Sequence, residues 1–202
     1  MSKEPVFHWT QSLLAEAGKE PFSDGSDLSG KLGYLLSQLD WKISEFCRMH
    51  QIVYKEIHQI KNAETDGNRV VNFADHMAIA GLWAIGEQFL GKIFKAYLSC
   101  KNGVDEITIK APCKWDDVKR EYLNNGIDLS LCKNYVNANE CRILNNAIRH
   151  ESTVSNKLVQ FAYFVTYYGM DLEKVPLEMQ RYVNSIYDFL ESLIRKANEN
   201  LG

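Results

Sequence analysis

The chain has 202 residues, a net charge of −3 at pH 7 and a pI near 6.0. Hydrophobic residues make up 46% of it and charged residues 24%, a balance typical of a globular protein that buries a substantial core. The acidic balance argues against capture of DNA or RNA by bulk positive charge. Any nucleic-acid binding would need a local basic patch instead.

The N-terminal segment, the most apolar stretch and the cysteines indicate where in the cell the protein is expected. The N-terminal segment carries no apolar run behind a basic one, so no signal peptide is expected. The most apolar stretch, residues 77–85, is too short to cross a bilayer and predicts a buried core helix. The five cysteines are scattered and none is in a CxxC pair, which indicates neither a zinc ribbon nor a disulfide framework. We therefore expect a cytoplasmic protein with no membrane association.

The first half of the chain is dominated by two long helical patterns. Residues 1–27 form a preamble, and residues 28–202 are predicted to be one helical domain. Apolar residues spaced by three and four predict an amphipathic helix over residues 27–63, followed by a turn at 65–68. A second long helix is predicted over residues 72–99. Its first half is apolar nearly all round, which is typical of the central helix of a bundle.

The second half is predicted to hold shorter elements. Residues 105–110 alternate briefly, as in a short strand or an extended segment. Helices are expected over 115–124, over about 138–149, and from about Val175 towards the C-terminus. Residues 157–168 are strand formers by propensity, yet we favour a helix or a mixed segment packed on the core. The predicted fold class is all-α, an antiparallel helical bundle.

The most informative stretch, residues 140–151, is predicted to form one helix with two opposed faces. Its apolar side gathers Cys141, Ile143, Leu144, Ala147 and Ile148, and its polar side gathers Arg142, Asn145, Asn146 and Arg149, with His150 at the edge. Arg142, Asn146 and His150 are spaced i, i+4, i+8 and form a nearly straight stripe. A guanidinium, an amide and an imidazole in a row suit the binding of a phosphodiester and proton transfer beside it. A solvated helix face is the plain alternative.

The other candidate residues give weaker indications of a catalytic or metal site. His50 and His58 could face the same way, but Glu56 lies off their face, so surface or partly buried histidines explain them as well as a metal site. His76 and Glu87 on the central helix are expected to pair structurally with a neighbouring helix. The sequence contains no nucleophile elbow, no cysteine in a nucleophile context and no phosphate-binding glycine loop. We expect no metal and no cofactor.

The helix of residues 140–151 resembles the signature of the HEPN superfamily (higher eukaryotes and prokaryotes nucleotide-binding), a group of small helical bundles. The family motif places an arginine, often followed by asparagine, a few residues before a histidine near the start of a late helix. Asn146 and His150 match this motif, whereas Asn145 stands where the family has arginine. Arg142 lies one turn upstream, and Arg149 directly precedes the histidine. The order of long and short helices over residues 28–202 is also similar.

This resemblance implies metal-independent RNA cleavage in a composite cleft between two copies of the chain. His150 would assist proton transfer as the ribose 2′-hydroxyl attacks the adjacent phosphorus, and an arginine would stabilise charge on the phosphate. Arg142 is the better candidate for that arginine, because it shares the stripe with Asn146 and His150. Asn146 would orient the histidine or the phosphate, and Arg149 and Asn145 would contact substrate.

Three interpretations stay open. The first is a HEPN-like endoribonuclease that acts as a homodimer in bacterial defence or in a toxin–antitoxin system, with an antitoxin or defence protein as partner. The second is a catalytically silent HEPN-like module that dimerises or binds a nucleotide or a partner, since Asn145 replaces the arginine. The third is an unrelated bundle whose polar stripe arose by chance. The aromatic run 161–168 is expected in the core rather than on a base-stacking surface.

Overall fold

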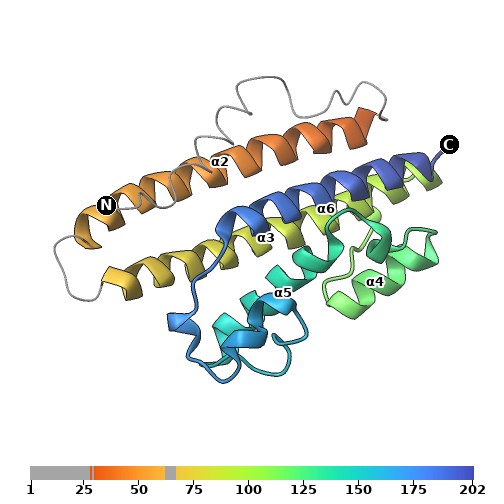
Figure 1. Cartoon of the computed structure of the whole chain (residues 1–202). Helices are drawn as coiled ribbons and strands as arrows, with labels where there is room; N and C mark the ends of the chain where they lie inside the picture. Colours follow the sequence, from red (N-terminus) through yellow and green to blue (C-terminus); the bar gives the residue numbers. More distant parts are fainter. Residues whose placement is uncertain (1–27, 29, 62–66) are drawn as a thin grey trace.

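The structure is a computed structural model that describes residues 28, 30–61 and 67–202, and it confirms the all-α bundle (Figure 1). Three long helices run side by side: α2 (Gly30–Lys61), α3 (Gly67–Asn102) and α6 (Met179–Glu199). The short connection between α2 and α3 makes them antiparallel neighbours. The predicted preamble lies outside the described residues.

The shorter helices α4 (Trp115–Asn124) and α5 (Tyr135–His150) form a further layer (Figure 1). They lie on the side of α3 and α6 that faces away from α2, and α5 packs against both α3 and α6. The bounds predicted for α4 are confirmed, and α5 begins three residues before the predicted start at 138. The polar stripe of α5 therefore belongs to an outer helix of the bundle.

Burial follows the predicted helical periodicities. Along α6, buried side chains recur every three or four residues, at Tyr182, Ile186, Phe189, Leu193 and Ala197. Helix α3 contacts α2, α5 and α6, which confirms its central place. It extends beyond the predicted helix at both ends, so Gly67 and Asn68, predicted as turn residues, are its first residues instead. None of the helices in the described ranges combines the length and the apolar character needed to cross a bilayer.

Residues 105–110 form no strand. They contain one 3-10 turn, Glu106–Thr108, whose first residues are capped by the Asp105 carboxylate, which accepts a hydrogen bond from the Ile107 N–H at 3.1 Å. The Ile107 side chain is 89% exposed, so the alternating pattern has no buried face that a sheet could use.

The segment between α5 and α6 is neither a strand nor an α-helix. It forms a 3-10 helix, Ala162–Tyr167, which buries Phe164, and a second 3-10 turn, Leu172–Lys174. The backbone N–H of Val154 donates to the Met170 carbonyl at 2.8 Å, so the loop closes on itself. This second 3-10 turn ends at its C-cap Val175, so α6 starts at Met179 rather than near 175.

Candidate functional site

Helix α5 has the predicted apolar and polar faces, except that one residue predicted on the polar face is buried. Cys141, Leu144 and Ala147 are buried, Arg142 is half-buried, and Asn146, Arg149 and His150 are exposed. Asn145, placed on the polar face by its residue type, is only 5% exposed. It follows Cys141 by four residues, so it falls on the buried stripe of the helix. The residue at the position of the family's arginine therefore does not lie on the open face.

Arg142 is held in place by two contacts. Its Nε donates to the Asn139 side-chain oxygen at 3.0 Å, and its guanidinium carbon lies 4.9 Å from the centre of the Trp115 ring. Burial lowers the pKa of Arg142, and the charges of Asp116 and Glu87 oppose that shift. A guanidinium keeps its proton at any physiological pH. Arg142 is thus a positioned, permanent positive charge.

One pocket, which we call the aromatic pocket, lies where α3, α4 and α5 meet. It has a volume of ≈ 320 Å³ and is lined by Trp83, Glu87, Leu90, Pro112, Cys113, Trp115, Val118, Arg142 and Asn146. The Trp83 and Trp115 rings meet edge to face, with their centres 5.9 Å apart. A small cavity with aromatic walls and a few polar groups is the usual form of a small-molecule site.

A second pocket, the histidine pocket, lies beside the last two turns of α5. Its volume is ≈ 480 Å³, and its lining comprises Arg142, Ile143, Asn146, Ala147, His150, Glu151, Lys157 and Gln160. The Lys157 ammonium pairs with the Glu151 carboxylate at 3.0 Å. Helix periodicity does not predict Lys157 or Gln160 as site residues, because a returning loop brings them to α5. Arg149 lines neither pocket.

The two pockets adjoin, since Arg142 and Asn146 line both. Together they form one groove along the outer face of α5, here called the α5 groove. At 1.5 Å per residue, Asn146 lies about 6 Å along the helix from Arg142 and about 6 Å from His150. The structure therefore brings together the three stripe residues predicted from their spacing, and it adds Lys157, Glu87 and Trp115.

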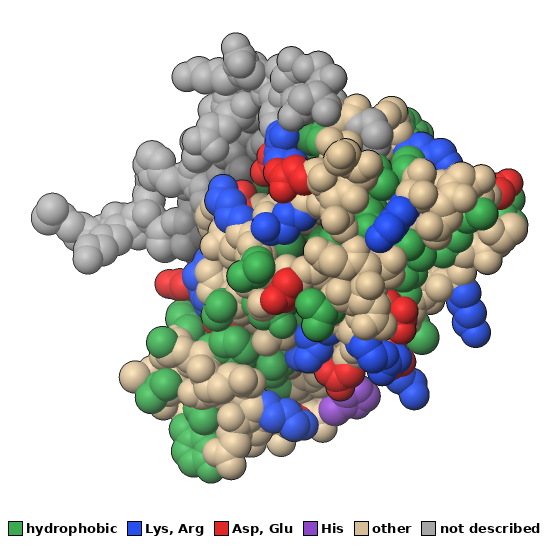
Figure 2. Space-filling model, turned by 90° about the vertical axis from the view of Figure 1, so that its right-hand side faces the viewer, with side chains coloured by type: hydrophobic (Ala, Val, Ile, Leu, Met, Phe, Trp, Pro, Cys, Tyr) green, Lys and Arg blue, Asp and Glu red, His purple; other side chains and the backbone are tan. Residues whose placement is uncertain are grey.

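The charge on this part of the surface is mixed. The lining of the α5 groove includes Arg142 and Lys157 as well as Glu87 and Glu151, and Figure 2 likewise shows basic and acidic side chains interspersed over one face of the molecule. His50 and His76 are buried, and His150 is exposed, while the side chain of His58 lies outside the described residues. A mixed surface of this kind binds an anion through a few placed cations rather than through a broad positive field.

His50 and His76 are buried in the interior of the bundle. The His50 imidazole lies 3.5 Å from the Asp75 carboxylate, with both side chains buried. Burial lowers the pKa of His76, although Asp75 and a hydrogen bond to the backbone of Leu172 oppose that shift. The expected structural role of His76 agrees with this contact, whereas Glu87 is exposed and lines the aromatic pocket. Within the described part of the chain, no three His, Cys, Asp or Glu side chains are grouped to hold a metal ion.

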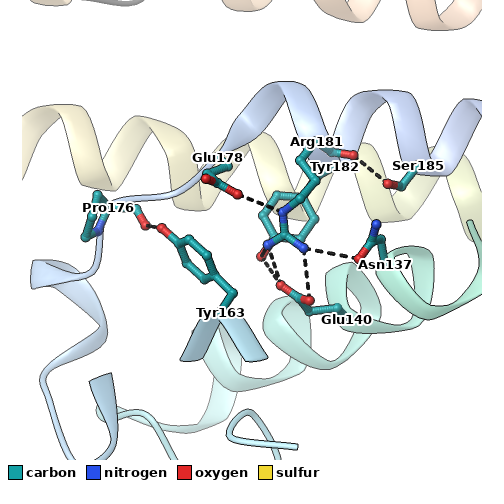
Figure 3. Close-up of polar contacts among 8 residues, drawn as sticks. All are labelled: Asn137, Glu140, Tyr163, Pro176, Glu178, Arg181, Tyr182 and Ser185. Atoms are coloured by element: carbon teal, nitrogen blue, oxygen red, sulfur yellow. Dashed lines mark hydrogen bonds and ion pairs between the residues drawn. The ribbon is translucent and has the colours of Figure 1, made fainter. Parts of the chain in front are cut away.

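A cluster centred on Arg181 connects α5 to α6 (Figure 3). Arg181 donates to both oxygens of Glu140, at 2.6 and 3.0 Å, and also to Glu178 at 2.9 Å. Its guanidinium lies 5.0 Å from the centre of the Tyr163 ring and 4.6 Å from that of Tyr182. These contacts leave no open position for a ligand, so the cluster positions α5 and with it the α5 groove.

The chain matches no protein-family model, no curated protein and no solved structure. A function for this chain must therefore be inferred from the residues of the α5 groove and their geometry.

Proposed function

We propose that this chain is a HEPN-like, metal-independent endoribonuclease that binds RNA along the α5 groove. One observation carries the proposal: Arg142 and Asn146 line two adjoining pockets, and His150 and Lys157 line the second of them. The all-α bundle, with this helix packed outside two long ones, agrees with the resemblance of the sequence to the HEPN superfamily. Fixed cations bind the RNA backbone, and an exposed imidazole transfers protons next to it.

The reaction is an internal transfer within the RNA. The ribose 2′-oxygen attacks the adjacent phosphorus, the bond from phosphorus to the 5′-oxygen breaks, and the products carry a 2′,3′-cyclic phosphate and a 5′-hydroxyl. One proton leaves the 2′-oxygen and one must reach the 5′-oxygen, so the step needs a base and an acid. His150 is the base. We further propose that the chain acts as a homodimer, in which His150 of the second copy is the acid.

Charge on the phosphate increases as the 2′-oxygen attacks, and fixed cations stabilise it. Arg142 supplies a permanent charge from its position against Trp115. Lys157 pairs with Glu151 in the free protein, and a bound phosphate would compete with that carboxylate for the ammonium. Arg149, exposed on the same turn as His150, contacts the neighbouring backbone of the RNA.

The test is incubation of purified protein with total RNA in the presence of EDTA. We expect cleavage by the wild type, and a loss of about 100-fold or more in rate for His150→Ala. Arg142→Ala should also abolish cleavage. Its matched control is Arg120→Ala, which removes an exposed arginine of α4 outside both pockets and should leave cleavage unchanged. Equal cleavage by wild type and His150→Ala would contradict the proposed role of His150, and intact RNA with every protein would contradict the enzyme.

Two further measurements test the biological setting of this proposal. Toxicity on expression in bacteria, relieved by His150→Ala, would support a role in defence or in a toxin–antitoxin system. The mass of the protein in solution would test the homodimer. A harmless wild type that is monomeric at micromolar concentration would contradict both parts.

A catalytically silent RNA-binding module is the second candidate, and two observations favour it. Asn145 is buried where the family motif has its arginine, and Arg142 already contacts Asn139 and Trp115. In that case the protein retains RNA in a salt-dependent manner, no RNA is cut, and His150→Ala leaves retention unchanged.

A further inference from the structure

The aromatic pocket differs in chemistry from the histidine pocket that it adjoins. Trp83, Leu90 and Val118 are buried and form its apolar interior. Glu87 and Asn146 are exposed and place a carboxylate and an amide at its opening. The only basic group in its lining is the Arg142 guanidinium. An apolar interior with a hydrogen-bonding edge suits a flat heterocycle better than a phosphate.

We propose that the aromatic pocket binds a guanine base, with the 3′-phosphate of the same nucleotide in the histidine pocket. This inference rests on the proposed function, since it names the base that precedes the cleaved bond. Arg142 and Asn146 belong to both pockets, so one nucleotide lies along the α5 groove across the boundary between them. Cleavage at this phosphate would leave fragments that end in guanosine 2′,3′-cyclic phosphate.

The flat surface for the base is the Arg142 guanidinium, whose other side lies against the Trp115 ring. The guanidinium lies over the Trp115 ring, which in turn stacks on Tyr135 with an interplanar angle of 18°. Bases in single-stranded RNA stack on aromatic rings and equally on guanidinium planes. Asn139 holds the Arg142 Nε at 3.0 Å, so this surface exists before any ligand binds.

Glu87 provides the selectivity among bases. A carboxylate only accepts hydrogen bonds, and the pairing edge of guanine offers two neighbouring donors, N1–H and the N2 amino group. Adenine presents an acceptor, N1, beside its single amino group. N1 carries no proton, so it cannot donate a hydrogen bond to the carboxylate and would repel it. Trp83, Glu87 and Leu90 lie on one face of α3, at i, i+4 and i+7, so helix α3 places the Glu87 side chain beside the aromatic wall.

The first test is a titration of the full chain with guanosine 3′-monophosphate and, separately, with adenosine 3′-monophosphate. Binding is monitored by tryptophan fluorescence in the presence of EDTA. We expect guanosine 3′-monophosphate to bind about tenfold more tightly, as one well-placed pair of hydrogen bonds provides. Glu87→Gln should abolish the preference. Glu199→Gln, which changes an exposed carboxylate at the end of α6, should keep it. Equal affinities, or a preference unchanged in Glu87→Gln, would overturn the proposal.

The second test locates the bound nucleotide. Cys113 lines the aromatic pocket and Cys100 does not, and both thiols are exposed. Trypsin releases them in separate peptides, residues 111–114 and 96–101, so alkylation by iodoacetamide can be followed at each cysteine in the same sample. Guanosine 3′-monophosphate should slow alkylation of Cys113 several-fold and leave Cys100 unchanged. Equal protection of both cysteines, or of neither, would place the nucleotide elsewhere.

The two proposals fail in distinguishable ways. Cleavage of RNA by a protein that does not prefer guanosine 3′-monophosphate would overturn this inference alone. Selective binding with protection of Cys113, but with no cleavage of RNA, would overturn the enzyme and leave the base pocket standing.

Discussion

At the scale of single residues, the two cations of the α5 groove differ in how firmly they are positioned. Arg142 is half-buried, lies against Trp115 and is hydrogen-bonded to Asn139. Lys157 is exposed and pairs with Glu151 across the surface. A planar guanidinium stacks on a ring and keeps one orientation, whereas an ammonium on a flexible stem does not. The shape of the groove therefore depends on Arg142 more than on Lys157.

Arg142→Lys tests this difference with the charge unchanged. We expect nucleotide or RNA affinity to fall about tenfold, because the ammonium loses both the stacking on Trp115 and the fixed hydrogen bond to Asn139. Lys157→Arg, which also exchanges one cation for another, should change affinity by less than about twofold. Binding titrations at two salt concentrations provide the measurement, and equal losses in the two variants would contradict the argument.

Asp40 is a second residue whose surroundings have a measurable consequence. Burial raises the pKa of the Asp40 carboxyl from 3.8 to about 6, against the effect of the hydrogen bond that Tyr187 donates to it at 2.9 Å. A raised pKa in the folded state means that the folded protein holds this proton more tightly than the unfolded chain. The contribution of protonated Asp40 to the free energy of unfolding is therefore fully present below pH 3.8 and is lost as the pH rises through about 6.

Asp40→Asn should therefore stabilise the protein at pH 8 and have little effect at pH 3.5. Asparagine keeps an acceptor for the Tyr187 hydroxyl and carries no charge to bury. Because Asp40 is only half-buried, solvent screening limits the gain to about 1 kcal/mol in the free energy of unfolding. Urea denaturation of wild type and variant at both pH values measures it, and a gain that did not depend on pH would argue for another cause.

At the scale of elements, the position of α5 depends on polar contacts as well as on packing. The Glu140 side chain is 4% exposed and that of Arg181 24% exposed, and they join the inner faces of α5 and α6 (Figure 3). Tyr182 also donates to Glu140, at 2.6 Å, and Tyr163 contacts Arg181 from the loop after α5. The same cluster thus holds both walls of the histidine pocket, the helix and the returning loop.

Removal of one partner of this buried pair should destabilise the protein strongly. For Arg181→Met we expect a loss of about 2–3 kcal/mol in the free energy of unfolding, since Glu140 is left buried without its counter-charge. The double variant Arg181→Met, Glu140→Gln should lose less than the sum of the two single variants, because no uncompensated charge remains. Chemical denaturation of all four proteins gives the comparison, and additive losses would show that the pair is not coupled.

At the scale of the whole molecule, the C-terminal end of the chain joins segments that are distant in sequence. The Asn200 amide donates to the Tyr97 hydroxyl at 2.8 Å and to the Asn125 carbonyl at 2.7 Å. These bonds connect the end of α6 to α3 and to the end of α4. Gly126 lies directly beneath that amide, with a φ of +88°.

Two glycines with positive φ allow this junction to be tested. An added Cβ at Gly126 would lie 3.0 Å from the Asn200 side chain, whereas at Gly103, with a φ of +65°, it would meet open space. Gly103→Ala should cost about 1 kcal/mol from backbone strain alone. Gly126→Ala should cost at least about 1 kcal/mol more, because the Asn200 amide must move from its two acceptors. Equal changes in thermal stability would show that the junction contributes little.

Much of the fold follows from local pattern. Apolar spacing predicted the long helices, α4 and α5 to within a few residues, since an amphipathic helix is specified by its own periodicity. Spacing also predicted that Arg142, Asn146 and His150 share one face. It placed Asn145 wrongly, because a residue type does not reveal which side of a helix a neighbour will cover. Residues 105–110 form a 3-10 turn instead of a strand, because they have no sheet partner. Residues 157–168 form the mixed segment, with one 3-10 helix packed on the core, that we favoured over the strand indicated by their propensity.

The sequence by itself determined the class of fold and the polar stripe of α5, because both depend on residues a few positions apart on one helix. Only the tertiary structure decided what surrounds that stripe. Glu87 and Trp115 reach it from α3 and α4, Lys157 reaches it from a returning loop, and Arg181 fixes the helix from α6. These contacts join residues that lie up to about sixty positions apart in the chain, and packing of the elements, not local periodicity, sets such distances.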